Sequence, residues 1–233
     1  MEDYNFKEDI INKIEKILKD SQKETNVLKE LKNLKTEYSY ENIHTCFEVC
    51  PDNYIGDIEG EKFISPNDRY KASKEEKTSQ LGKSAEENII ILLESPHIDE
   101  FKKNLTAPAL GETGNRLNSY LEDLLKNYLV AKSKAKLFLV NAIQYQCSLG
   151  FSTDCVRNFV FNQLFNEDTF KKDLKERIDK QNPKIIVIAT TSFCRKKIKD
   201  WVLNEYKDNK VSIYEADSHP SVWTSKTKIT ACE

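Results

Sequence analysis

Long apolar runs are missing from this sequence of 233 residues. No stretch approaches the roughly 18 consecutive apolar residues that a membrane-spanning helix needs. The first ten residues, MEDYNFKEDI, are acidic and contain no apolar segment of the kind that a signal peptide carries. Internal repeats and low-complexity tracts are absent too. We therefore expect a cytoplasmic protein that does not act at a membrane, with room for one well-packed α/β domain.

The sequence also lacks the cysteine pattern of a secreted, disulfide-bonded domain. Its six cysteines are Cys46, Cys50, Cys147, Cys155, Cys194 and Cys232. The C-x3-C and C-x7-C intervals of the first four match no standard ligand signature, although an iron-sulfur or zinc site remains open. We expect reduced thiols packed as small hydrophobic groups, and no cofactor.

An overall excess of basic charge, the usual footprint of nucleic-acid binding, is absent, because the net charge is -2. The charge is unevenly distributed along the chain. Residues 1–100 contain 14 Lys and Arg against 23 Asp and Glu, whereas residues 101–233 contain 22 against 15. A field that attracts a polyanion is therefore expected on the later part of the chain.

Two regions with different patterns are present. Residues 8–34 have the apolar spacing of amphipathic helix, and residues 35–87 carry scattered Pro and Gly that indicate loops and a short helix. We interpret 1–87 as a helical and loop extension packed on the core. From residue 88 to 233, apolar strands at 88–94, 136–143, 184–190 and 210–216 alternate with helices at 115–129, 156–166, 170–180 and 192–206. This alternation predicts a three-layer α/β/α domain around a four-stranded parallel sheet.

Ligands of such sheets bind beyond the carboxyl ends of the strands, so the residues that follow each strand are informative. Polar side chains gather there: Glu94, His97, Asp99, Asn141, Asp217, His219 and Ser221. Each alone also fits a role as a strand end, a helix cap or a loop residue. Their shared position predicts a functional edge of the sheet.

Five segments, LLESPH, PALGETGNRLNSYL, LFLVNAI, PKIIVIATTS and YEADSHPSVW, resemble in their order the uracil-DNA glycosylase superfamily. The resemblance covers about residues 88–225 and implies a parallel sheet between helices. In that superfamily the first strand leads into a motif such as GQDPYH or GEAPG, the second ends in an asparagine that reads the base, and the fourth leads into an HPS loop. A G-x-x-G-x-x-L segment near the first motif matches Gly111 to Leu117.

The resemblance implies a role for each matched residue. Breaking an N-glycosidic bond builds positive charge on the sugar, which a carboxylate stabilises, and Glu94 is the first choice, with Asp99 and Glu100 as substitutes. His219 would donate a hydrogen bond to the departing base, and Asn141 would read its edge. His97, Ala109 and Leu110 would line the base pocket. DNA contacts would come from Pro96, Gly111, Thr113, Gly114, Ser218, Pro220, Ser221 and Trp223. Val222 and Trp223 would fill the gap that the base leaves or pack beside it, and Trp223 is equally suited to a place in the core.

This sequence departs from the superfamily pattern at the base pocket. His97 stands where the uracil enzymes place a tyrosine that excludes thymine, and Ala109 stands where related branches place a stacking aromatic. The sequence therefore predicts a monomeric DNA glycosylase for a damaged or modified base, of the type that removes modified bases from phage DNA. The alternatives are a non-catalytic nucleic-acid-binding protein, a metal hydrolase using His97, Asp99 and His219, and a small-molecule-binding domain.

Overall fold

The computed structural model describes residues 49–59, 62–64, 87–97, 100, 109, 111–125, 134–147, 154–208 and 210–232. The helices expected within residues 8–34 lie outside these ranges, as do most of the other residues of the expected extension. None of the helices that the structure describes combines the length and the apolar character needed to cross a membrane.

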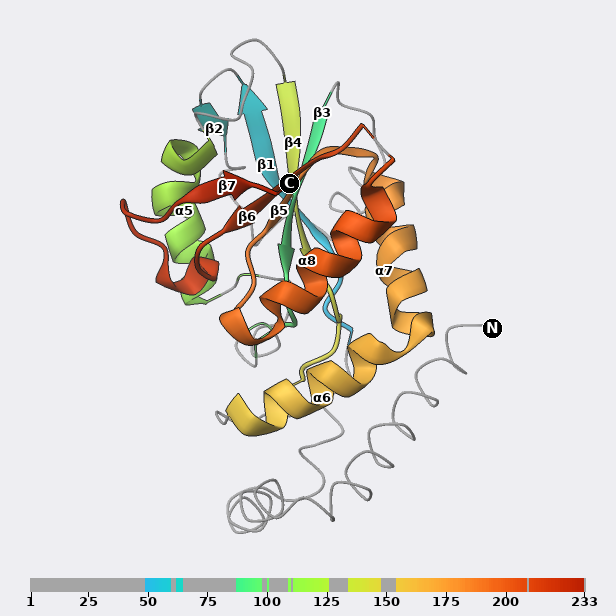
Figure 1. Cartoon of the computed structure of the whole chain (residues 1–233). Coiled ribbons are helices and arrows are strands. Elements are labelled where there is room, and N and C mark those ends of the chain that lie inside the picture. Colours follow the sequence, from blue (N-terminus) through green and yellow to red (C-terminus); the bar gives the residue numbers. More distant parts are fainter. Residues whose placement is uncertain are drawn as a thin grey trace.

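A mixed sheet forms the centre of the described structure, with its strands in the order β2-β1-β4-β3-β5-β6-β7 (Figure 1). These strands are β1 (Asn53–Glu59), β2 (Lys62–Ile64), β3 (Glu87–Leu93), β4 (Lys134–Asn141), β5 (Pro183–Ile188), β6 (Ser212–Ala216) and β7 (Ile229–Ala231). β3 pairs in parallel with β4 and β5, and β5 pairs in parallel with β6. The remaining pairs, β1 with β2 and β4 and β6 with β7, are antiparallel. The mixed α/β class is therefore confirmed.

The expected four-stranded, all-parallel sheet needs correction, because antiparallel strands extend it at both sides. β1 falls within residues 35–87, where loops and a short helix were expected, and it pairs with β4 across the expected boundary at residue 88. The sequence of β1, NYIGDIE, has few apolar residues, so no strand pattern was visible. Gly56 also makes the pairing of this strand irregular, because it lies at an irregularity of the β1–β4 register and has a φ of 155°. β7 has three residues, too few to produce a recognisable period.

β3 runs through the middle of the sheet, and its apolar residues are fully buried. Because successive side chains of a strand point to opposite faces, Ile90 and Leu92 enter one core while Ile89, Ile91 and Leu93 enter the other. Burying one such side chain stabilises the fold by about 1.5–3 kcal/mol. A continuous apolar run is thus the expected sequence for a strand covered on both faces.

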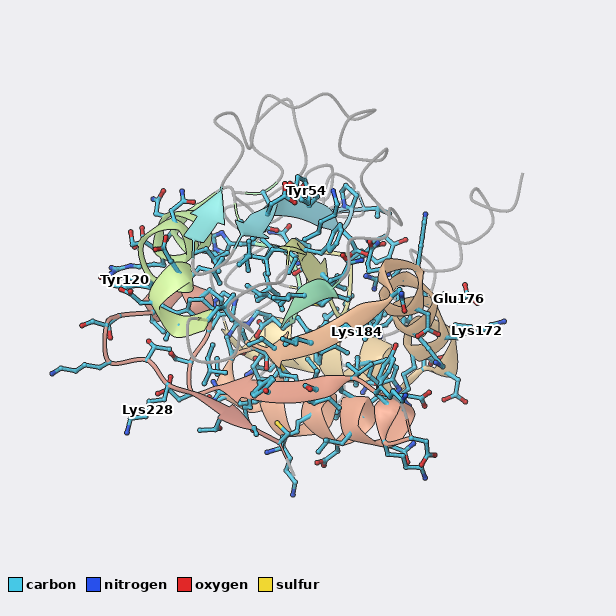
Figure 2. The ribbon with its side chains drawn as sticks, turned by 90° about the horizontal axis from the view of Figure 1, so that it is seen from above. Tyr54, Tyr120, Lys172, Glu176, Lys184 and Lys228 are labelled. Atoms are coloured by element: carbon cyan, nitrogen blue, oxygen red, sulfur yellow. The ribbon has the colours of Figure 1, made fainter. Side chains whose placement is uncertain are left out.

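Helices cover both faces of the sheet (Figure 1). α5 (Glu112–Leu125) packs on one face, and α6 (Asp154–Asn166), α7 (Asp168–Gln181) and α8 (Ser192–Tyr206) pack on the other. α7 and α8 bury residues three or four positions apart, so each presents one largely apolar stripe to the sheet. Figure 2 shows Lys172 and Glu176 on the outer side of α7, away from Tyr120 on α5.

Candidate active site

The carboxyl ends of β4, β3, β5 and β6 lie side by side at one edge of the sheet. Leu93, the last residue of β3, pairs with Asn141, the last residue of β4. On its other side, Leu92 pairs with Ile188 of β5, which in turn pairs with Glu215 of β6. The residues that follow these strands, among them Glu94, Thr191 and His219, are consequently brought to the same edge.

Glu94 is held there by α8. Its side chain is buried, with 2% of its surface exposed. Oε2 accepts hydrogen bonds from the backbone N–H of Thr191 at 3.1 Å, from the Thr191 hydroxyl, and from the Cys194 thiol at 3.5 Å. Thr191 is the residue that begins α8, and the positive end of a helix dipole favours a carboxylate at this position. Burial and the neighbouring Glu94 raise the pKa of Cys194 to about 12, which keeps its thiol protonated as a donor.

Arg157 of α6 supplies the positive charge for the other Glu94 oxygen. Its Nε lies 3.3 Å from Glu94 Oε1, and its guanidinium lies over the ring of Phe193, 5.3 Å from the centroid. A buried carboxylate requires such a partner, because removing an ion from water costs several kcal/mol. The two oxygens of Glu94 are therefore in different surroundings, one fixed on the α8 terminus and the other beside a cation.

His219 begins the short 3-10 helix η4 (Pro220–Val222) that follows β6. Its Nδ1 accepts a hydrogen bond from the Ser221 backbone N–H at 3.2 Å and lies 2.9 Å from the Ser221 hydroxyl. Burial, with repulsion from Arg157, Arg195 and His97, lowers the pKa of His219 to about 4. The imidazole is thus neutral at pH 7 with its proton on Nε2, where it can donate a hydrogen bond.

Arg195 of α8 ties the His219 segment to the end of β5. It donates to the carbonyl of Asp217 at 2.8 Å and to that of Thr190 at 2.9 Å. The segment from Asp217 to Lys228 is also closed on itself: the Asp217 N–H donates to the Lys228 carbonyl at 3.0 Å, and the Lys228 N–H donates to Asp217 Oδ2 at 3.1 Å. We call residues 217–228 the His219 loop. Because hydrogen bonds fix both ends of this loop, the backbone that carries His219 has a defined position.

Asn141 is 1% exposed at the end of β4. Its backbone carbonyl accepts from Arg177 Nη2 at 3.0 Å, and the same arginine forms an ion pair with Asp52 at 2.8 Å. The Asn141 side chain donates through Nδ2 to the Cys50 sulfur at 3.9 Å. Within the described residues, Oδ1 of Asn141 is buried without a hydrogen-bond partner.

Glu100, expected as a substitute acid, is engaged elsewhere. It is 5% exposed; Oε1 accepts from the backbone N–H of Ala109 at 2.9 Å, and Oε2 accepts from the Cys50 thiol at 3.6 Å. Ala109, expected at the base wall, has a left-handed backbone with a φ of 62° and is 2% exposed. Asp99, the other substitute acid, and Leu110 lie outside the described residues.

His97, expected to line the base pocket, is exposed. The expected DNA-contact residues differ in exposure: Ser218 and Ser221 are partly buried, and Pro96 and Pro220 are buried. Around the start of α5, Gly114 is buried, whereas Gly111 and Thr113 are partly exposed. α5 packs against η4, so the structure brings the GETG and SHPS segments together.

Trp223 needs correction as a DNA-contact residue. Its side chain is fully buried in the core beneath α5, and its Nε1 donates to the Ser218 carbonyl at 2.9 Å. The neighbouring Val222 is 60% exposed. The sequence did not separate these two residues, because an indole is equally suited to a core and to a stacking contact. Val222 is the apolar side chain of this loop that faces solvent.

The cysteines expected as possible metal ligands do not form a described centre. Cys50 and Cys147 are buried and free, while Cys46 and the side chain of Cys155 lie outside the described part of the chain. Among the described residues, no group of three or more His, Cys, Asp or Glu side chains is arranged to hold a metal ion. Burial raises the pKa of the Cys147 thiol, whereas ligation requires the thiolate.

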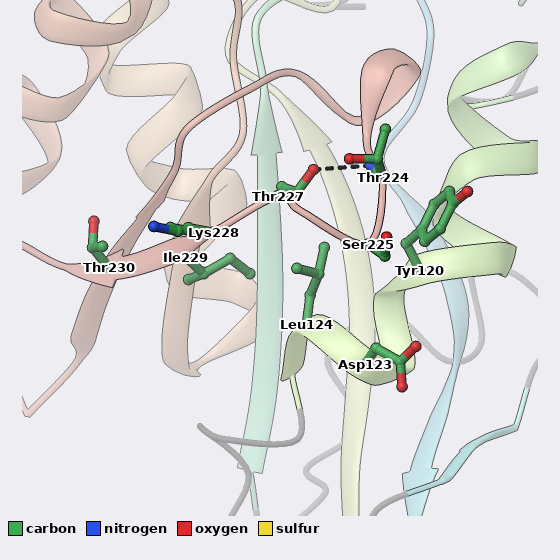
Figure 3. A pocket seen from close by; sticks show the side chains of 9 residues that line it. All are labelled: Tyr120, Asp123, Leu124, Thr224, Ser225, Thr227, Lys228, Ile229 and Thr230. Atoms are coloured by element: carbon green, nitrogen blue, oxygen red, sulfur yellow. Dashed lines mark hydrogen bonds between the residues drawn. The ribbon is translucent and has the colours of Figure 1, made fainter.

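A separate hollow of about 450 Å³ lies between α5 and the chain that leads into β7 (Figure 3). Tyr120 and Leu124 of α5 face Ser225 and Ile229 across it. The Thr224 N–H donates to the Thr227 hydroxyl on its border at 2.9 Å. Its described lining contains none of the site residues named from the sequence.

Sequence reasoning missed four side chains that support the site, Arg157, Arg177, Thr191 and Arg195, and it named Cys50 only as a possible metal ligand. A signal existed for Arg157, since it interrupts the otherwise apolar and amide-rich helix DCVRNFVFNQLFN. Cys50 precedes β1 by three residues, and its position near Asn141 could not be predicted because β1 itself was not recognised in the sequence. No protein-family model matches this chain, and no curated protein matches it either, so the residues and their geometry carry the functional interpretation.

Proposed function

We propose that this protein is a DNA glycosylase that hydrolyses the N-glycosidic bond of a flipped-out uracil, damaged base or modified base. The observation that carries the proposal is the position of Arg157, which lies 3.3 Å from the buried carboxylate of Glu94 and whose charge also acts on His219. The parallel order β4-β3-β5-β6 with helices on both faces supports it, since the resemblance to uracil-DNA glycosylases implies a three-layer core of this kind.

The chemistry divides between the two groups. As the bond from C1′ to the base nitrogen breaks, the base takes the bonding electrons and the sugar becomes positive. Glu94 stabilises that positive charge and orients the water, which adds to C1′ and releases a proton. The Nε2–H of His219 donates to the oxygen on which negative charge develops, and the base leaves protonated. An abasic site remains in the strand.

Cellular context follows from the same proposal. Four described cysteines are free, which fits the reducing cytoplasm. We propose a monomer that acts there on DNA, with the modified bases of phage DNA as one class of substrate. His97 and Ala109 replace the side chains that restrict the pocket of the uracil enzymes, and this favours a base larger than uracil.

The test uses duplex and single-stranded oligonucleotides that carry uracil or modified cytosines, scored for strand cleavage by alkali at abasic sites. Glu94→Gln is expected to lower the rate of base release by about 100-fold or more. Glu176→Gln, on the exposed side of α7, is the control and should match wild type. No release from any of these strands by wild type would refute the proposal.

A second candidate is a non-catalytic DNA-binding protein of the same fold. It is favoured by the engagement of both Glu94 oxygens in the described structure, which leaves little of the carboxylate exposed. Salt-dependent DNA binding without base release would select it.

A further inference from the structure

Three buried polar side chains, Glu100, Cys50 and Asn141, form a chain that the scheme above does not use. The Cys50 sulfur lies 3.6 Å from Glu100 Oε2 and 3.9 Å from Asn141 Nδ2. Cys50 comes from the segment before β1, Asn141 ends β4, and Glu100 follows β3. These contacts therefore connect three segments of the fold and end on Asn141, the residue expected to read the base.

The donors and acceptors in this chain can be assigned from their chemistry. A thiol has one proton, and burial together with the neighbouring Glu100 raises the pKa of Cys50, so the proton stays on sulfur. Glu100 accepts at both oxygens, from Ala109 and from Cys50. With its proton directed at Glu100, the sulfur can only accept from Asn141, and the amide must therefore turn Nδ2 toward it.

This assignment leaves Asn141 Oδ1 facing the other way. That oxygen is buried and has no hydrogen-bond partner among the described residues. Buried acceptors are almost always paired, because an unpaired one has lost its water without compensation. An orphaned acceptor at the edge of a candidate site indicates a ligand that brings a hydrogen-bond donor.

The same carboxylate also holds the backbone of Ala109, the residue expected at the wall of the base pocket. Its Oε1 accepts from the N–H of Ala109, whose left-handed φ of 62° is unfavourable for any residue with a Cβ. Strained backbone of this kind persists where the surroundings hold it, and it concentrates at functional sites. Glu100 thus contacts both the wall residue and, through Cys50, the reading residue.

We propose that Glu100 and Cys50 are positioning residues that fix the orientation of the Asn141 amide and so set the donor and acceptor pattern that selects the base. The inference rests on the proposed function. Uracil-type bases present an N–H at position 3 beside a carbonyl, whereas cytosine-type bases present a ring acceptor beside an amino group. Rotating the amide by half a turn exchanges its donor and acceptor, and it therefore exchanges preference between these two classes.

Glu100→Gln provides the sharpest variant, since it keeps the shape and removes the charge. The glutamine oxygen can still accept from Ala109, but its NH2 group now faces the Cys50 sulfur. The thiol then accepts from Gln and directs its proton at Asn141, which turns Oδ1 toward it. Asn141 would then present Nδ2 where it presented Oδ1, although the residue itself is unchanged.

The experiment measures kcat/KM for a uracil strand and a matched 5-hydroxymethylcytosine strand. In Glu100→Gln, the ratio of the two values should change by about tenfold or more relative to wild type, the equivalent of one hydrogen bond. Cys50→Ala should shift the ratio in the same sense, and Cys50→Ser, whose hydroxyl can donate and accept in the same way, should restore it. Cys232→Ala, at the far edge of the sheet beyond β7, is the control and should leave the ratio unchanged. An unchanged ratio in both Glu100→Gln and Cys50→Ala would overturn the proposal.

A second readout does not depend on activity. The side-chain amide signals of Asn141, assigned by their loss in Asn141→Asp, should show slow hydrogen exchange in wild type, faster exchange in Cys50→Ala and slow exchange in Cys50→Ser. If wild type releases no base, the proposed function fails, and amide exchange alone decides the positioning role. Exchange that is identical in wild type and Cys50→Ala would refute that role. If Glu100→Gln does not fold, the comparison of Cys50→Ala with Cys50→Ser still decides the test.

Discussion

Arg157 acts from α6 on two candidate site residues, Glu94 and His219. It lies 3.3 Å from Glu94 Oε1, where its charge balances a buried carboxylate, and it contributes to the lowered pKa of His219. A single cation thereby lies beside a buried carboxylate and favours the neutral form of a histidine within one site.

Lowered stability in acid is the first expected consequence. Burial lowers the pKa of His219 to about 4, below its ordinary value of 6.5, so the folded state binds fewer protons than the unfolded state between these values. The stability that this histidine contributes is present above about pH 6.5 and is lost as the pH falls toward 4. Between pH 7 and pH 5 wild type should lose about 2 kcal/mol of unfolding free energy that His219→Gln does not lose. Urea denaturation at both pH values measures this, with His97→Gln as the control for the other histidine nearby.

Trp223 and Val222 should respond in opposite ways to truncation. Trp223→Ala removes a fully buried indole and should destabilise the fold by about 3–5 kcal/mol. Val222→Ala removes an exposed side chain and should change stability by less than about 0.5 kcal/mol, while it weakens base release if this residue enters the gap in the duplex. Equal destabilisation of both variants in thermal unfolding would contradict the assignment.

At the scale of elements, α7 does more than cover the sheet. Arg177, 14% exposed by its side chain, donates to the carbonyls of Asn141 and Ala142 and pairs with Asp52, which lies just before β1. One side chain therefore joins α7, the end of β4 and the start of β1. It fixes the backbone from which the Asn141 side chain extends.

Arg177→Met tests this junction. It should lower the unfolding free energy by about 3–5 kcal/mol, because Asp52 loses its cationic partner and two carbonyls lose a donor in a buried setting. Lys172→Met on the exposed side of the same helix is the control and should change stability by less than about 0.5 kcal/mol. Loss of similar size in both variants would show that helix propensity rather than the junction is responsible.

The sequence predicted the helices and the central strands well, because the apolar residues that they bury recur periodically in the helices and follow one another without interruption in the strands. The helix expected at 192–206 coincides with α8, and Ile89–Leu93 lie fully within β3. The sequence did not predict β1 and β7, because these strands are short or polar and form by pairing with strands that are distant in the sequence, which a local pattern cannot show. For the site, strand ends indicated Glu94, Asn141 and His219, whereas their supporting partners lie far along the chain and become neighbours only through the fold.

The whole molecule has a low net charge with an acidic first part and a basic later part. Lys226 and Lys228 are exposed on the His219 loop, whereas Lys172 and Lys184 lie elsewhere on the surface, as Figure 2 shows for Lys228, Lys172 and Lys184. Lys184 is near the start of β5, at the edge of the sheet opposite the candidate site. If DNA binds at the carboxyl edge of the strands, only the first pair of lysines meets phosphate.

Salt dependence of DNA affinity separates these lysine pairs. Lys226→Gln and Lys228→Gln should each reduce the slope of log affinity against log salt concentration by about 0.9. Lys172→Gln and Lys184→Gln should leave the slope unchanged. Fluorescence anisotropy over a series of salt concentrations measures it, and an equal reduction for all four variants would place the DNA elsewhere.

Closure of the His219 loop at Asp217 and Lys228 makes it a separable unit within the domain. Because its ends meet, residues can be exchanged or inserted between them without displacing β6 or β7. Trp223 is the exception, because its buried side chain requires the loop to return to the core at that position. Sequence change on either side of Trp223 is therefore expected to alter the surface of this loop while it leaves the folding of the sheet intact.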